Sequence, residues 1–367
     1  MKPVDEPGGM RSSQEKVGAV VVHFGDVART FECLDSLLVA IDTIGKDSWI
    51  AGGSVVVIDN SGNVQPERVE LRYGGQVTYL RPESNIGYAG GCWRGVEFLK
   101  EATVLVLCNN DIVLHKEALA KLLACLRVLP DCGALQPVVQ VKGKNPPVID
   151  SLGFTFSPLM NCFNYSNWNV PHLQTSQLAN GCTVTECFGA EGLFLVVRRD
   201  RFDEVGGWDP SFFMFQEDAL LSWKFRLKGY KNYVCHDSVV YHERGGTARG
   251  YLLKVNPVFP AYYISRNKIL CVLYLYKLSW LAKYLSIVVI FELAKNLFLS
   301  VRFRSGLYLY YYFKALLFIV GHRKHAMMER LRVVRNVDVG GFLSKRDLIP
   351  ILSAFKLILQ RLNDIVE

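Results

Sequence analysis

The sequence lacks the features that are typical of exported, zinc-binding and membrane-spanning proteins. Residues 1–16 (MKPVDEPGGMRSSQEK) are polar, without a signal-peptide core, so we expect a flexible N-terminus and a cytoplasmic protein. The ten cysteines have no paired C-x-x-C spacing, which excludes the common zinc signatures and indicates reduced, buried thiols. No apolar run reaches the roughly 20 residues that a spanning helix needs. No nucleic-acid-binding module is visible, so nucleic acid is not an expected partner.

Negative charge is scarce in the C-terminal third. Residues 251–367 hold 18 Lys and Arg against 6 Asp and Glu, whereas residues 1–250 hold 24 against 28. Three apolar, aromatic-rich runs in this region are bounded by charged residues: Ile269–Tyr276, Tyr284–Phe291 and Ser305–Phe313. Basic amphipathic helices of this kind lie along anionic headgroups. We expect residues 251–367 to form a helical region that associates peripherally with the inner face of the cell membrane. The alternative is a helical subdomain that packs on the rest of the chain or on a second subunit in an oligomer.

Short β-branched runs alternate with helical segments from residue 17 to about residue 115. The predicted strands are Val17–Phe24, Ser54–Asp59, Val77–Leu80 and Val104–Cys108, and the predicted helices begin near Thr30, as N-cap, and span Trp93–Glu101. This alternation predicts an α/β fold with a mainly parallel, doubly wound sheet flanked by helices. Residues 141–185 have no sustained period and predict loops and short strands.

Three polar features fall where the predicted strands end. They are Asp59, the glycine-rich loop Asn85–Gly91, and Asp111, which follows Asn109-Asn110. Each alone has a simpler explanation, as a turn residue, a tight packing site or a helix cap. Ligands of doubly wound sheets bind beyond the carboxyl ends of the strands, where all three converge. Asp111 with its amide neighbours suits Mg²⁺ or Mn²⁺ that also touches a diphosphate.

A second set of candidate residues lies between residues 186 and 247. Glu217 and Asp218 open a helical pattern that Gly229 stops, and His242 closes the apolar strand that follows. The helix dipole favours a carboxylate in the first turn, so Asp218 is placed to accept a proton from a hydroxyl. The alternative is that both acids only cap the helix.

The order of these segments resembles a known enzyme family. The matching pieces are VVVHF, VVVIDNSGN, NIGYAGGCWRG, LCNNDIVL, GAEGLFLVVRRDRFDEVGGWDPSFFMFQEDALLSWKFRLKGY and VVYHERGGT, over roughly residues 17–247. The chain resembles the GT-A glycosyltransferases of family 2, and most of all the bacterial rhamnosyltransferase group. The resemblance implies a GT-A catalytic domain over residues 17–250, with a nucleotide half at about 17–115 and an acceptor half at about 116–250. It also implies a nucleotide-sugar donor, a divalent metal and an inverting mechanism.

The resemblance also implies a role for each matching residue. Asp218 would be the catalytic base, with Glu217 as the second choice. Asp111 and His242 would hold the metal, with Asn109 in place of the first aspartate of the DxD-type motif, so that one carboxylate remains. The residues implied at the donor nucleotide are His23, Asp59, Arg81, Asn85, Gly87 and Asn110. The residues implied at the acceptor or sugar are Trp208, Glu191 and Arg244, although a core position for Trp208 is the alternative.

The resulting function is transfer of a sugar from a dTDP- or UDP-sugar to a growing cell-surface glycan. By resemblance, the sugar is L-rhamnose from dTDP-rhamnose, and the acceptor is a glycan such as O-antigen on a polyprenyl diphosphate. Two alternatives stay open: a nucleotidyltransferase that acts on a sugar phosphate, and a non-catalytic nucleotide-binding scaffold at the membrane surface. Metal-dependent hydrolysis of sugar nucleotides discriminates between the glycosyltransferase and these two alternatives.

Overall fold

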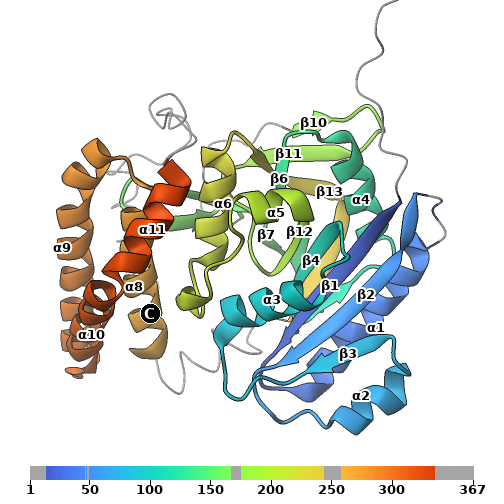
Figure 1. The fold of residues 1–367 in the computed structure, drawn as a ribbon, viewed down its shortest axis with the longest axis horizontal. Helices are drawn as coiled ribbons and strands as arrows, with labels where there is room; N and C mark the ends of the chain where they lie inside the picture. The colour runs from blue at the N-terminus through green and yellow to red at the C-terminus, as the bar shows by residue number, and fades with distance from the viewer. Residues whose placement is uncertain (1–13, 46, 48, 167–174, 244–257, 335–367) are drawn as a thin grey trace, which may run out of the picture.

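A single mixed sheet runs through the larger part of the molecule (Figure 1). The computed structural model describes residues 14–45, 47, 49–166, 175–243 and 258–334. In these residues the sheet has 11 strands, with the order β10-β11-β13-β6-β12-β4-β1-β2-β3, while β5 pairs with β13 and β7 pairs with β6. The strands are β1 (Glu15–His23), β2 (Ile50–Asp59), β3 (Val77–Leu80), β4 (Val104–Asn109), β5 (Ile112–Leu114), β6 (Cys132–Val141), β7 (Ile149–Ser151), β10 (Thr175–Gln177), β11 (Thr183–Cys187), β12 (Phe194–Arg198) and β13 (Lys231–His242).

The central strands of the sheet run parallel, whereas β12 inside it and the strands β5, β7 and β11 beside β6 and β13 run antiparallel to their neighbours. β1 pairs in parallel with β2 and with β4, β2 pairs in parallel with β3, and β6 pairs in parallel with β13. β12 runs antiparallel between β4 and β6. Because two antiparallel steps restore the direction, β1, β2, β3, β4, β6 and β13 all end at the same edge. The mainly parallel central sheet is therefore confirmed, with β12 as a reversed strand that the sequence did not predict.

Alternation along β1 explains how both faces of the sheet are covered. Val17, Ala19 and Val21 are buried with helices α1 (Val27–Ile44) and α4 (Ala118–Val128). Val20 and Val22 are buried on the opposite face, where three other helices pack. These helices are α3 (Gly87–Phe98), α5 (Arg199–Glu204) and α6 (Glu217–Leu227). Helix α2 (Pro66–Tyr73) precedes the edge strand β3, and strands β8 (Phe154–Phe156) and β9 (Cys162–Asn164) form a separate hairpin. All ten cysteines are free thiols, as the sequence predicted.

Two helix starts differ from the prediction. Helix α3 begins at Gly87, six residues before Trp93, so the glycine-rich stretch forms its first turn rather than a loop. Gly87 has φ +75°, which glycine adopts at little cost, and this lets the helix start directly after Asn85 and Ile86. Helix α1 is capped by Asp26, whose carboxylate accepts from the Ala28 amide, while Thr30 is buried and bonds His23.

In the residues described after 257, four helices follow the sheet domain, and α8 and α11 pack against α6 (Figure 1). They are α8 (Val258–Leu275), α9 (Leu278–Arg302), α10 (Leu307–Gly321) and α11 (Arg323–Val334). The expectation that no helix is long enough to span a membrane was wrong. Among the residues described, α9 alone is long and apolar enough to cross one, by length and composition only. Glu292 and Lys295 do not interrupt α9, because they pair with each other and Glu292 also binds Lys268 of α8.

The buried ion cluster fixes the inner face of α9. Glu292 is fully buried, and its carboxylate accepts from Lys268 (2.5 Å), from Lys295 and from the Ser265 hydroxyl (2.7 Å). Burial alone would raise the pKa of Glu292, but Lys268 and Lys295 outweigh it and lower that pKa to about 2. Burial outweighs the ion pair at Lys268 and lowers its pKa. We take the carboxylate as ionised, because two ammonium groups share it.

Candidate active site

Four of the predicted site residues lie at or beside the ends of the strands that share one edge of the sheet. His23 ends β1, Asp59 ends β2, Asp111 lies two residues beyond β4, and His242 ends β13. His23 pairs with Asp59 in the parallel register of β1 and β2, and His242 pairs with Ile112 next to Asp111. The carboxyl-edge convergence that the sequence predicted is therefore present in the fold.

His23 and Asp59 form a buried polar cluster. The His23 ring bonds Thr30 through Nδ1 (2.5 Å) and Asn63 through Nε2 (2.7 Å), and Nε2 lies 3.7 Å from Asp59. Asn110 donates to Thr30 (2.8 Å), which brings the segment after β4 into the same cluster. Both His23 and Asp59 are almost fully shielded from solvent. The cluster therefore holds the loop after β2, through the hydrogen bond from His23 to Asn63.

The Asp59 carboxylate is bonded on both oxygens. Burial alone would raise its pKa, but hydrogen bonds, first of all from the Tyr79 hydroxyl, outweigh it and lower the pKa. Its donors are the amides of Ser61, Gly62 and Val64, the Tyr79 hydroxyl (2.7 Å) and the Arg81 guanidinium (3.2 Å). Of the side chains in this set Arg81 is the exposed one, with 41% of its side chain accessible. A ligand beside this loop would therefore meet Arg81 before Asp59.

Gly87 lies where helix α3 approaches the segment that precedes α6. A Cβ at Gly87 would come within 2.2 Å of the Phe213 carbonyl oxygen, so no other residue fits without movement. The Ala89 amide donates to that same carbonyl (3.0 Å), and Asn60 donates to the Gly87 carbonyl (2.8 Å). The exposed Asn85 accepts from the Gly87 amide (2.8 Å). The start of α3 thus links the loop after β2 to the Phe213 segment.

His242 lies between two carboxylates. Its Nε2 is 3.4 Å from Asp111, and its Nδ1 bonds Asp150 at 2.5 Å. Burial alone would lower the pKa of His242, but hydrogen bonds to Asp111 and Asp150 raise it to about 9. The raised pKa favours the imidazolium, which joins the ends of β13, β5 and β7; a cation held by Nε2 would displace the proton from that nitrogen.

Glu217 and Asp218 occupy the first turn of α6, as predicted. Glu217 is buried, and burial, followed by the nearby Asp218 charge, raises its pKa well above the usual range. Asp218 is half-buried and accepts from the Gly192 amide (3.1 Å) and from the Ala219 amide (2.7 Å). A proton-accepting role therefore suits Asp218 better than Glu217.

A short backbone path connects Asp218 to the Asp111 side of the edge. Gly192, which bonds Asp218, precedes Leu193, whose carbonyl accepts from the Asn109 amide (3.0 Å). Tyr88 of α3 donates to the Gly192 carbonyl (2.5 Å) from the other side. Asp218 of α6, through the residues that precede β12, and Asp111, two residues beyond β4, consequently lie at the same edge of the sheet.

The residues around His242 fit a divalent cation. Within the described ranges no group of three or more His, Cys, Asp and Glu side chains is arranged to hold an ion. However, Asp111 and His242 offer one carboxylate and one imidazole, and Asp150 holds Nδ1 so that Nε2 points at Asp111. A carboxylate behind a metal-binding histidine is the usual way of orienting the ring. Two protein ligands leave room for diphosphate oxygens, which Mg²⁺ and Mn²⁺ favour.

The three predicted acceptor residues have different environments. Trp208 has 1% of its surface exposed and packs on Tyr88 with the ring centroids 5.4 Å apart, so the structure places it in the core, not against a sugar. Glu191 is half-buried, bonds Asn164, and directly precedes the Gly192 that contacts Asp218. Arg244 lies outside the described residues.

Asp150 is a site residue that the sequence reasoning missed. It lies in the stretch from 141 to 185 that was predicted as loops and short strands, and it is the hydrogen-bond partner of His242. A signal was present: Val148-Ile149-Asp150 repeats the ending of the Ser54–Asp59 strand, where an apolar run stops at an aspartate. The run is too short for periodicity alone to detect.

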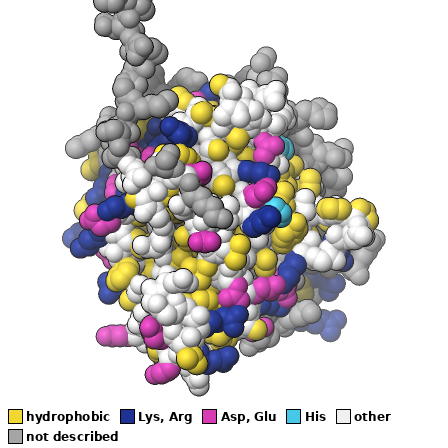
Figure 2. Space-filling view, turned by 90° about the vertical axis from the view of Figure 1, so that its right-hand side faces the viewer, with side chains coloured by type: hydrophobic (Ala, Val, Ile, Leu, Met, Phe, Trp, Pro, Cys, Tyr) yellow, Lys and Arg dark blue, Asp and Glu magenta, His cyan; other side chains and the backbone are white. Residues whose placement is uncertain are grey.

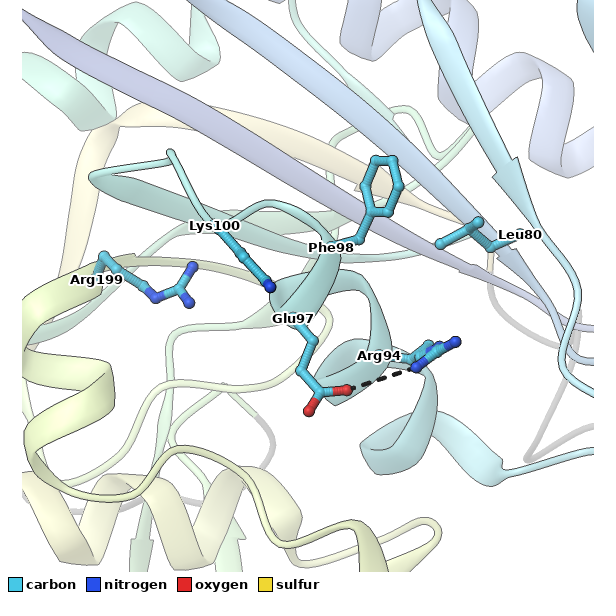
Figure 3. A pocket seen from close by; sticks show the side chains of 6 residues that line it. All are labelled: Leu80, Arg94, Glu97, Phe98, Lys100 and Arg199. Carbon is cyan, nitrogen blue, oxygen red and sulfur yellow. Dashed lines mark ion pairs between the residues drawn. The ribbon is translucent and has the colours of Figure 1, made fainter.

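An open hollow with positive charge lies elsewhere, along the second half of α3 (Figure 3). Its lining includes Arg94, Lys100 and Arg199, and Arg94 pairs with Glu97 at 3.8 Å. None of the predicted site residues lines it. Arg199 follows the far end of β12, so this hollow is separate from the edge that carries Asp111 and Asp218.

The fold and the site define an α/β enzyme of the GT-A glycosyltransferase type. A family model described as "Glycosyltransferase like family 2" matches residues 15–255, and the chain belongs to this family. No curated protein matches the sequence.

Solved structures that align with this chain have little sequence in common with it. GalNAc-T7, crystallised with UDP, GalNAc and Mn²⁺, aligns with TM-score 0.52 and 15% identity over 72% of this chain. The alignment covers 48% of GalNAc-T7, so this chain spans about half the length of that protein. The mannosyltransferase PcManGT from Pyrobaculum calidifontis, in complex with GDP-Man and Mn²⁺, aligns with TM-score 0.47 and 13% identity over 89% of this chain and 88% of its own. TarS from S. aureus (residues 1–349) aligns with TM-score 0.44 and 16% identity over 74% of this chain and 70% of its own.

Proposed function

We propose that this glycosyltransferase transfers a sugar from a nucleoside diphosphate to an acceptor hydroxyl with inversion at the anomeric carbon. One observation supports this most: Asp218 lies at the same sheet edge as the Asp111–His242 pair, through Gly192, Leu193 and Asn109. A nucleotide sugar already carries a good leaving group. The enzyme must therefore stabilise charge on the diphosphate and activate the acceptor. The Asp111–His242 pair serves the first function and Asp218 serves the second.

Asp218 acts as the general base in this proposal. Its carboxylate is held by the Gly192 amide and lies in the first turn of α6, where the helix dipole favours the ionised form. It accepts the acceptor's proton as the oxygen attacks, so no enzyme nucleophile is needed. The raised pKa of Glu217 disfavours a second negative charge beside Asp218.

The other site residues bind the donor. Arg81, Asn85 and the turn at Gly87 lie beside the loop after β2, where His23, Asn110 and Asp59 fix the backbone for the nucleotide. Asp111 and His242 would hold Mg²⁺ or Mn²⁺, which when bound neutralises charge on the departing diphosphate. Asp150 keeps the His242 ring turned toward Asp111.

A panel of sugar nucleotides tests the reaction class. We expect one donor, with dTDP-rhamnose and UDP-sugars as the first candidates, to raise the melting temperature when Mn²⁺ is present and less when EDTA replaces it. The same donor should release nucleoside diphosphate slowly in the presence of Mn²⁺, and faster with acceptor. Release of inorganic diphosphate from a nucleoside triphosphate and a sugar phosphate would instead indicate a nucleotidyltransferase.

We further propose that the acceptor is a glycan on a polyprenyl diphosphate, met at the inner surface of the cell membrane. The support is the outer surface of α9 and α10. Exposed apolar residues recur every three or four positions along one face of each helix: Ile290, Leu293, Leu297 and Val301 on α9, and Leu307, Tyr310, Phe313, Leu317 and Val320 on α10. The polar residues Glu292 and Asn296 face inward instead. Exposed apolar faces of this size mark interaction surfaces in soluble proteins.

Charge on this surface favours an anionic bilayer over a second copy of the chain. Between residues 278 and 334 the acidic side chains are Glu292 and Glu329, and both are buried in ion pairs. The exposed charged residues there are all basic: Lys283, Arg302, Arg304, Lys314, Arg323, Lys324 and Arg332. By contrast, acidic and basic side chains are interspersed over the opposite end of the molecule (Figure 2). Two such basic surfaces would repel each other, whereas acidic headgroups would attract them.

Vesicle flotation tests this surface. The protein should float with vesicles that contain phosphatidylglycerol, less with pure phosphatidylcholine, and less at high salt. Leu297→Asp and Leu317→Asp should each weaken binding by on the order of 10-fold or more, because a buried leucine side chain is worth about 1.5–3 kcal/mol. Leu71→Asp is the control, since Leu71 is 89% exposed on α2. Equal weakening by all three changes, or dimerisation through this face, would contradict a membrane role.

A further inference from the structure

The segment between the short 3-10 helix Pro210–Phe212 and α6 is backbone-strained. Phe213, Phe215 and Gln216 have φ of 63°, 65° and 67°, in the left-handed region that non-glycine residues avoid. Gln216 is the N-cap of α6, and its carbonyl accepts from the Leu220 amide at 2.9 Å. Such a conformation persists only where its surroundings impose it.

Two buried polar side chains of α8 hold this segment by its carbonyl groups. The Asn267 amide donates to the carbonyls of Phe212 (2.9 Å), Met214 (2.9 Å) and Phe215 (2.7 Å). Arg266 donates to the carbonyls of Ser211 (2.6 Å) and Phe212 (2.8 Å). Asn267 is completely buried and Arg266 nearly so.

The hydrogen bonds of Arg266 to the segment are made to backbone carbonyls and not to a carboxylate. Its charge meets carbonyl dipoles and the ring faces of Tyr263 and Phe318, whose centroids lie 4.7 and 4.3 Å away. Its Nε also donates to the Asn267 side-chain oxygen (2.8 Å), which turns the Asn267 amide group toward the segment. A buried guanidinium that loses its hydrogen-bond acceptors costs free energy. The contacts of Arg266 with the carbonyls of Ser211 and Phe212 therefore resist movement of the segment.

The held segment touches both halves of the reaction site. The Phe213 carbonyl bonds the start of α3 at Ala89 and lies against Gly87, on the donor side. At its other end the segment sets the first turn of α6, which carries Asp218. A shift of this backbone would therefore move the base relative to the donor.

We infer that Asn267 is a positioning residue for Asp218, acting through the strained segment 213–216. The inference rests on the proposed function of Asp218 as the base. It means that the helices after residue 257 take part in the reaction, because α8 fixes the geometry of the catalytic turn. A misplacement of about 1 Å at a reacting group can reduce the rate on the order of 100-fold.

Asn267→Asp is the direct test. It keeps the size of the side chain, removes the amide donors and points a carboxylate oxygen at three carbonyls. We expect kcat to fall about 10–100-fold and the KM of the donor to change less, since Asn267 bonds the carbonyls of Phe212, Met214 and Phe215, whereas Gly87 and Ala89 meet the Phe213 carbonyl. Asn296→Asp is the matched control. Asn296 is also a buried amide and bonds Ser265 and the Glu292 carbonyl of the same helical region, but it does not contact the segment.

Rescue separates positioning from general destabilisation. Gln216→Gly removes the cost of the left-handed conformation at that position, so it should restore part of the lost kcat in the Asn267→Asp background. If Asn267→Asp does not fold, Asn267→Ser, which keeps one donor, replaces it in the same comparison. A kcat loss no greater than that of Asn296→Asp, or no rescue by glycine, would overturn the inference.

Hydrogen exchange tests the same inference without an activity assay. The amides of residues 211–217 should exchange faster in Asn267→Asp than in Asn296→Asp at equal global stability. Unchanged exchange there would overturn the positioning role by itself. Failure of every donor to react, with faster exchange in this segment, would instead refute the proposed function and leave the structural role of Asn267 intact.

Discussion

Replacing Asp218 by asparagine should lower kcat by about 10²–10⁴ while the affinity for the donor hardly changes, because general-base help is worth about that much. Asparagine keeps the size of the side chain and can still accept from the Gly192 amide, so the fold of the turn should survive. The variant loses only the ability to take the acceptor's proton. Steady-state kinetics with a fixed acceptor, together with donor-dependent thermal stabilisation, measure the two effects separately.

Glu217→Gln discriminates between the two neighbouring acids. Burial and the Asp218 charge raise the pKa of Glu217, which favours its neutral form, and glutamine imitates that form closely. The larger loss should therefore follow the change at Asp218. A fully active Asp218→Asn enzyme would remove Asp218 as the base, and the reverse ranking would assign the role to Glu217.

Replacing Asp111 by alanine should remove most of the Mn²⁺-dependent binding of the donor. Asp111 is the one carboxylate directly beside His242 Nε2, and Asn109 occupies the position where a second carboxylate would help. The loss should exceed the roughly 10–100-fold that changing a residue behind a metal ligand costs. The measurement is the thermal shift given by nucleoside diphosphate with Mn²⁺ and with EDTA, supported by direct Mn²⁺ titration.

Asp150→Asn supplies the graded comparison for Asp111. Asparagine can keep a hydrogen bond to His242 Nδ1 but loses the charge that orients and polarises the ring, so Mn²⁺ affinity should fall by about 10–100-fold. The metal assignment is refuted if Asp111→Ala retains the full Mn²⁺-dependent shift. An effect of Asp150→Asn larger than that of Asp111→Ala would place the ion on the other side of His242.

The sequence predicted the strands and helices that bring the site together. The apolar runs Val17–Phe24, Ser54–Asp59 and Val104–Cys108 predicted buried strands, and the structure ends these strands at His23, Asp59 and Asn109, at a common edge because they are parallel. The helix that opens with Glu217 and Asp218 was predicted with a stop at Gly229, and the observed helix ends at Leu227, because its apolar spacing and its glycine stop agree. These signals are local, so they can be seen without the fold.

Several features were invisible because they depend on contacts between distant segments. The reversed strand β12, the Asp150–His242 hydrogen bond over 92 positions and the burial of Trp208 have no local signature. The full length of α9 was not predicted, because the charged residues Glu292 and Lys295 follow the apolar run Tyr284–Phe291 and end it in the sequence. In the structure these two residues form a buried ion cluster with Lys268 of α8.

The sequence alone thus determined which side chains stand at the strand ends, because alternation and turn chemistry act over a few residues. Only the tertiary structure decided which of them meet and what holds them. The left-handed backbone before Asp218 exists because Asn267, about fifty positions later, bonds its carbonyls. A conformation that costs free energy locally can be stabilised only by partners from elsewhere in the chain, and no local pattern encodes those partners.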